Sequence, residues 1–199
     1  MNIDIVRRQT QQYFYKDGLI EIGVGIIFAV LGTVFLVLPL LPSGIRWPVV
    51  ISVPLLIIAG TFATRGLISK LKERIVYPRT GFVKYDEKPS HGRWFVVSGA
   101  LVIAAAAFFL PEDLTSIALV EGLLLALILS FLGYRVGLVR LYLVATVAII
   151  SGIAITLSEV GDTPGSAWVF VIAGVALLLS GFIALVKYLR ANPPPKEEA

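Results

Sequence analysis

The 199-residue sequence contains no cysteine and only one histidine, His91. Disulfides, thiol nucleophiles and the Cys/His clusters that bind zinc, haem or iron–sulfur centres are therefore excluded. No glycine-rich phosphate-binding loop followed by Lys-Ser/Thr is present either. We accordingly expect no metal, no cofactor and no enzymatic activity, with an enzyme of unfamiliar type as the alternative.

Charged residues are also scarce. They make up 15% of the chain, against roughly 25% in an ordinary soluble domain, while 57% of the residues are hydrophobic and the mean hydropathy is +0.89. A single core of this length cannot hide so much apolar surface from water, whereas a bilayer accepts it in stretches of about 20 residues. The composition excludes a soluble globular protein and indicates an integral membrane protein.

Six apolar runs are long enough to cross a bilayer. They occupy residues 19–41, 47–64, 94–110, 115–134, 141–157 and 166–188. We therefore expect an all-α, polytopic bundle of six transmembrane helices in three hairpins, which span residues 19–65, 94–135 and 136–188. Because the first run is too long for a signal peptide and no cleavage site follows it, we expect it to stay in the mature protein.

The placement of the positive charges predicts the orientation. Assigning alternate loops to alternate sides puts sixteen of the seventeen Lys and Arg residues on one face and leaves Arg46 on the other. By the positive-inside rule the first face is cytoplasmic. We expect a protein of the plasma (inner) membrane with both its N-terminal interfacial segment, residues 1–18, and its Pro-rich tail, residues 189–199, in the cytoplasm. Because topology accounts for the net charge of +4 and no nucleic-acid-binding motif is present, we expect no nucleic-acid partner.

Small residues recur at four- or seven-residue spacing in three of the predicted spans. They are Gly18, Gly25 and Gly32 in the first, Ala118, Gly122, Ala126 and Ser130 in the fourth, and Ser166, Ala173 and Ser180 in the sixth. In lipid, helices associate where small residues let their backbones approach closely. The pattern predicts packed helix faces, either within one chain or against a second copy or a partner membrane protein.

Two carboxylates, Glu21 and Glu121, lie within predicted spans. Because burying an ionisable group in a membrane is costly, each is a candidate proton or cation site. Glu21 is about three residues inside the first span, on the face of the Gly18 and Gly25 stripe. Its structural explanation is an interfacial carboxylate that pairs with an Arg or Lys of the cytoplasmic loops.

Glu121 lies deeper, roughly six residues from the external end of the fourth span. Arg46 is the only cation predicted on that half of the protein, so the carboxylate has little countercharge there. This environment suits a proton relay or a cation site. The structural alternative is a carboxyl group that hydrogen-bonds a neighbouring helix through Thr156, Ser158 or a backbone carbonyl.

The segment at residues 66–93 is basic and amphipathic. Its first part has an apolar face at helical spacing, made of Leu67, Ile68, Leu71 and Ile75, and a polar face made of Ser69, Lys70, Lys72, Glu73 and Arg74. This pattern predicts a helix that lies on the inner membrane surface. There it would dock anionic lipid headgroups or a partner protein. The candidate docking residues are Lys70, Lys72, Arg74, Arg79 and Lys84. The alternative is a positively charged anchor with no partner.

The predicted spans contain few polar or charged side chains. The sequence therefore favours a non-enzymatic membrane scaffold or accessory protein whose basic segment docks lipid or a partner. A small proton- or cation-linked transporter or channel that uses Glu121 is the alternative. A polar cavity that reaches Glu121 would favour transport, and a dry, closely packed interior would favour the scaffold.

Overall fold

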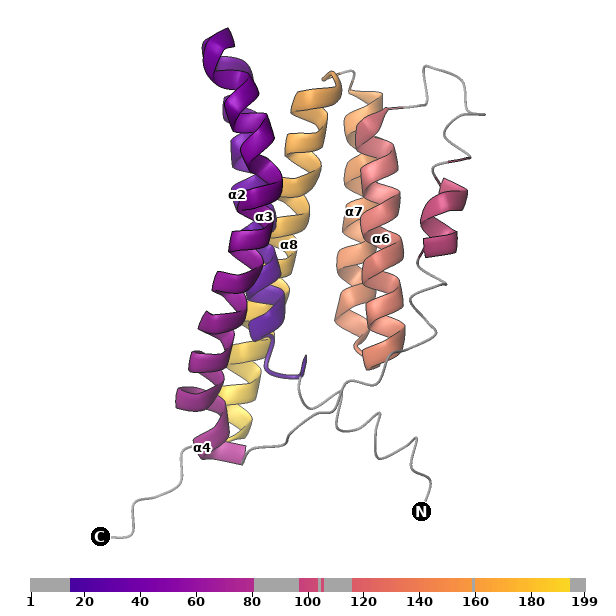
Figure 1. Ribbon diagram of the computed structural model, residues 1–199. Helices are drawn as coiled ribbons and strands as arrows, with labels where there is room; N and C mark the ends of the chain where they lie inside the picture. The colour runs from indigo at the N-terminus through magenta and orange to yellow at the C-terminus, as the bar shows by residue number, and fades with distance from the viewer. Residues whose placement is uncertain (1–14, 81–96, 104, 106–115, 159, 194–199) are drawn as a thin grey trace, which may run out of the picture.

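The computed structural model describes residues 15–80, 97–103, 105, 116–158 and 160–193. All regular structure in these ranges is helical, and the long helices run side by side (Figure 1). The elements are α2 (Leu19–Val37), η1 (Leu38–Leu40), α3 (Ser43–Leu71), η2 (Lys72–Val76), α4 (Tyr77–Thr80), α6 (Ile117–Val136), α7 (Val139–Leu157) and α8 (Asp162–Ala191).

Five of these helical stretches are long and apolar enough to cross a membrane. They are Leu19–Leu40, Ser43–Arg79, Ile117–Val136, Val139–Leu157 and Asp162–Ala191. The prediction of an all-helical membrane protein is thus supported, with five of the six expected spans among the described residues. The other span, expected at residues 94–110, lies largely outside them. Its described part, residues 97–103, is helical, and the count of six stays a prediction.

The α2 and α8 helices pack through glycines along their whole shared length. The facing pairs are Gly18 with Gly181, Gly25 with Gly174, and Gly32 with Ala167. A methyl group added at Gly25 would lie 2.9 Å from the carbonyl oxygen of Gly174, which is backbone and cannot move aside. Since the α2 glycines are seven residues apart, they lie on one face of the helix. This confirms the predicted packed face and places it within a single chain.

The α6 and α7 helices pack in the same way. A methyl group at Gly122 would lie 2.6 Å from the carbonyl oxygen of Ala148, and one at Gly152 would lie 2.9 Å from that of Ala118. Leu177 of α8 completes a buried cluster with residues of α6 and α7. Among the described elements, the most extensive contacts therefore join helices of different predicted hairpins, α2 with α8 and α6 with α7.

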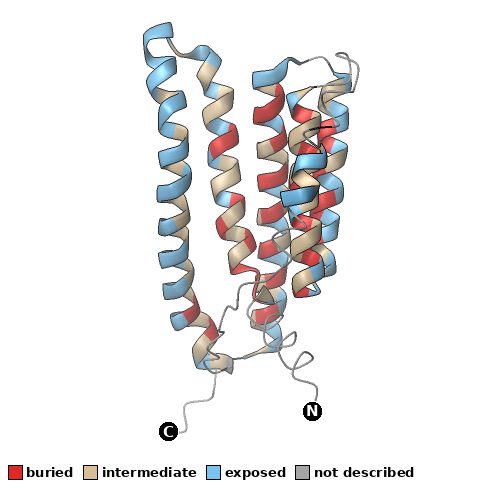
Figure 2. Cartoon of the chain, turned by 45° about the vertical axis from the view of Figure 1, so that its right-hand side comes forward, coloured by how far each residue is buried: buried red, intermediate tan, exposed pale blue. Residues whose placement is uncertain are grey.

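The α3 helix lies at the edge of the bundle. It contacts α2, and none of its residues is buried, so it is pale blue over nearly its whole length in Figure 2. Large apolar side chains such as Trp47, Leu55 and Phe62 are exposed along it. In a membrane protein such side chains face lipid or another membrane protein.

The first part of the basic segment continues α3 and is not a separate surface helix. Beyond Leu71 the helix passes through η2, a π-helical turn, into α4. Ile68 and Leu71, which the sequence placed toward the membrane surface, pack against a buried cluster that includes Leu19 of α2 and Tyr188 of α8. The prediction of a surface-lying helix is therefore wrong up to residue 80, because its apolar face meets other helices of the same chain.

The η2 turn also changes which side chains face inward. A π turn is wider than an α turn and shifts the phase of the residues that follow. Regular α-helical spacing predicts that Ile75 faces inward, and after the π turn Val76 takes that place. Lys72 begins the turn four residues after Ile68 and therefore shares its face, so the expectation that Lys72 lies on the polar face is wrong. In the structure Lys72 and Val76 are the buried pair, with 2% and 5% of their surface exposed.

Replacing Gly174 by alanine tests the α2–α8 contact. The added methyl group would lie 2.7 Å from the backbone nitrogen of Ala29 and 3.0 Å from the oxygen of Gly25. We expect a loss of about 1–3 kcal/mol of stability from this overpacking, measured as a lower midpoint of thermal unfolding in detergent by circular dichroism. Gly66→Ala is the matched control, since that helical position faces open space and alanine favours helix. Equal midpoints for the two variants would contradict the glycine contact.

Candidate functional site

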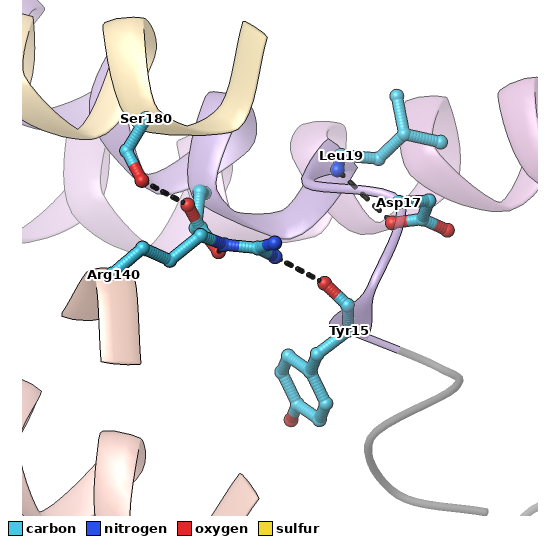
Figure 3. Close-up of polar contacts among 6 residues, drawn as sticks. Tyr15, Asp17, Leu19, Arg140 and Ser180 are labelled. Atoms are coloured by element: carbon cyan, nitrogen blue, oxygen red, sulfur yellow. Dashed lines mark hydrogen bonds and ion pairs between the residues drawn. The ribbon is translucent and has the colours of Figure 1, made fainter. Parts of the chain in front are cut away.

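Glu21 is the centre of a buried charged cluster where α2 begins. Arg140 of α7 donates from Nε to Glu21 Oε1 at 2.7 Å, and Ser180 of α8 donates from Oγ to Oε2 at 2.7 Å. Arg140 also donates from Nη2 to the carbonyl oxygen of Tyr15 at 2.6 Å (Figure 3). Glu21 thus faces protein and has an arginine partner, as expected for a structural carboxylate. Its use as a proton or cation site stays a prediction.

A second buried ion pair joins the chain before α2 to the end of α3. Lys72 Nζ lies 3.0 Å from Asp17 Oδ2, and the two side chains are 3% and 2% exposed. The other carboxylate oxygen, Oδ1, accepts a hydrogen bond from the backbone N–H of Leu19 at 3.0 Å. Sequence reasoning missed this pair. The available signal was Asp17 itself, an acidic residue directly before an apolar helix, where it accepts an N–H bond that the helix cannot satisfy.

The predicted docking residues divide into three groups. Lys72 was predicted to be exposed and is buried against Asp17, so it is not part of a docking surface. Arg79 donates to the carbonyl oxygens of Leu189 and Asn192, at 3.3 and 2.9 Å, and so binds the C-terminal end of α8. Lys70 and Arg74 are exposed. Lys84 lies outside the described residues.

Glu121 is half-buried on α6, beside the Gly122 contact with α7. Its carboxyl group lies near the hydroxyl of Ser166 on α8. The expected partners are wrong, because the hydroxyls of Thr156 and Ser158 donate to carbonyl oxygens of their own helix, at 2.7 Å each. The Glu121 Oε2 atom is buried and makes no hydrogen bond to the described part of the chain.

Arg46, the one cation predicted on the external side, closes the connection between α2 and α3. Its Nε donates to the carbonyl oxygen of Leu41 at 2.7 Å, and its Nη2 donates to that of Pro39 at 2.8 Å. The guanidinium group therefore satisfies carbonyls at the end of η1, where a helix leaves them without partners. This cation has a structural role in the connection.

Comparisons with protein-family models, with curated proteins and with solved structures found no match to the chain. Within the described residues, no three His, Asp or Glu side chains gather closely enough to hold a metal ion. The buried ion pairs and most of the exposed cations lie at one end of the described bundle, where α2 begins and α8 ends.

Replacing Arg140 by glutamine tests the Glu21 cluster. The variant leaves a buried carboxylate without its countercharge, so we expect a loss of about 3 kcal/mol in the free energy of unfolding. The double variant Arg140→Gln, Glu21→Gln should regain part of the lost free energy of unfolding, because a neutral amide needs no countercharge. Arg135→Gln is the control, since Arg135 has no ion pair among the described residues. Unfolding in detergent measures the change in free energy for each single variant and for the double variant. Strictly additive changes would contradict the coupling between Glu21 and Arg140.

Proposed function

We propose that the protein is a non-enzymatic integral membrane scaffold or accessory protein of the plasma (inner) membrane, with a basic cytoplasmic end that docks anionic lipid. The observation that carries the proposal is the exposed charge at the end where α2 begins and where α3 and α8 end (Figure 1). The exposed cations there are Lys16, Arg65, Lys70, Arg74, Lys187 and Arg190. Asp17 and Glu21 at the same end are buried in ion pairs, so among the described residues the exposed Glu73 is the acid that offsets these six cations, and the surface charge stays positive.

The charge distribution also supports the cytoplasmic orientation of this end. Arg46 lies at the opposite end of the described bundle, where its donors are used on neighbouring carbonyls. An excess of Lys and Arg on one side of the spans is what the positive-inside rule associates with the cytoplasm. Anionic lipids on that side attract basic residues close to the membrane surface.

The packing around Glu121 favours a scaffold over a transport path. Gly122 on the same helix approaches the Ala148 carbonyl, and Gly152 approaches that of Ala118, so backbone meets backbone on this side of Glu121. Such contacts hold helices together at fixed distance. We propose that the exposed apolar surface of α3 contacts a partner membrane protein or a second copy of the chain.

The lipid-docking proposal predicts a difference between Lys70 and Lys72. Lys70→Gln combined with Arg74→Gln should lower the preference for spin-labelled phosphatidylglycerol over phosphatidylcholine several-fold in reconstituted vesicles, since each basic residue near the surface contributes about 1 kcal/mol. The unfolding midpoint should not change. Lys72→Gln should instead lower the midpoint, because it leaves the buried Asp17 carboxylate without its countercharge. An unchanged lipid preference in the double variant would contradict the proposal.

Proton- or cation-linked transport is the second candidate, and the buried Glu121 Oε2 is the observation that favours it. A buried oxygen without a protein partner is available to a proton or an ion. The scaffold proposal predicts that vesicles with reconstituted protein show no more proton or cation flux than protein-free vesicles. It also predicts that the Glu121→Gln variant shows the same flux as the natural protein. Flux in the natural protein that the Gln variant abolishes, with folding unchanged, would favour transport.

A further inference from the structure

A groove of about 410 Å³ lies between α7 and α8, at the same end of the bundle as the Glu21 cluster. Its volume is within the range of small-molecule sites, roughly 300–1,000 Å³. Most of the lining is apolar and includes Leu143, Val147 and Ile183. On α8 the lining residues extend from Ala176 to Lys187, which is about 16 Å of helix. The groove therefore extends along the direction of the helices.

Two cations lie at one end of this groove. Arg140 is near the start of α7 and Lys187 is near the end of α8, and both line the groove. Lys187 is exposed and has no ion pair among the described residues. Two of the five N–H donors of Arg140 are in use, one to Glu21 and one to the carbonyl oxygen of Tyr15. Because Glu21 offsets only one of the two positive charges, the end of the groove has a net charge of about +1.

We propose that this groove binds one anionic phospholipid, with its phosphate between Arg140 and Lys187 and an acyl chain along the apolar lining. A soluble phosphate would use the two cations and leave the apolar length of the groove without a function. A zwitterionic lipid would fill the apolar length and bring no net charge to the cations. Basic pockets between transmembrane helices on the cytoplasmic side are known to bind anionic headgroups in this way.

The groove shares Lys187 with the exposed cations of the lipid-docking proposal, but Lys70 of α3 and Arg74 of η2 do not line it. Lys70 and Arg74 attract anionic lipid through surface charge alone, whereas the groove adds an apolar wall built by α7 and α8. Ser180 lines the groove and also donates to Glu21, so the charged cluster positions this wall. Bound lipid here would be retained through purification, and lipid attracted by surface charge would exchange.

The test counts lipids that stay bound to the full chain purified in mild detergent. Phosphatidylglycerol and phosphatidylcholine with identical chains are titrated, and intact complexes are weighed by native mass spectrometry. We expect one tightly bound phosphatidylglycerol and weaker binding of phosphatidylcholine. Lys187→Gln should weaken phosphatidylglycerol binding about fivefold and leave phosphatidylcholine unchanged. Soluble glycerol phosphate should not displace the lipid.

Matched substitutions test the apolar wall. Val147→Phe fills the groove and should abolish retention of both lipids, whereas Val50→Phe on α3 should have no effect. The two valines are 37% and 39% exposed, so both variants are expected to fold, which their unfolding midpoints check. Equal retention of both lipids by the natural protein, or wild-type retention in both Lys187→Gln and Val147→Phe, would overturn the proposal. The Lys70→Gln, Arg74→Gln variant should keep the retained lipid, so failure of either lipid proposal can be recognised separately.

Discussion

The close approach of α2 and α8 through their glycines is the contact on which the rest of the structure depends. Lipid gives little hydrophobic reason for two apolar helices to associate, so close backbone packing must hold them together. Gly18 begins this contact with a left-handed backbone, φ 75°, at the turn into α2. Close to this contact Glu21 accepts a hydrogen bond from Ser180 on α8, and it also binds Arg140 on α7.

The two ion pairs depend on that packing and in turn fix the ends of the helices. A buried ion pair costs nearly as much desolvation as it gains in attraction, so it adds little stability and penalises any arrangement that separates its members. Asp17 with Lys72 fixes α3 to the start of α2, and Glu21 with Arg140 fixes α7 to the same place. The ends of helices that are far apart in the sequence are thereby held together at one end of the bundle.

Much of this could be predicted from the sequence, since span length, charge asymmetry and small-residue spacing are local properties. They predicted five spans that the described residues contain, the packed glycine face and a basic partner for Glu21, which is Arg140. The rest depended on distant contacts or on irregular helix geometry. The π turn at Lys72–Val76 shifts the helical face, and no spacing rule reveals it. The partner of Glu121 was mistaken because Thr156 and Ser158 bond their own helix.

The α3, η2 and α4 elements follow one another without a break and form one helical rod, which is longer than a bilayer is thick. The stretch Ser43–Arg79 has 37 residues, or about 55 Å at 1.5 Å per residue, while a bilayer with its headgroups is about 40–45 Å thick. If the rod starts at the headgroups of one leaflet and stands near the bilayer normal, Lys70 lies about 40 Å along it, at the level of the headgroups of the other leaflet. Arg74 follows one turn later, and Arg79 extends beyond the lipid, where it holds the end of α8.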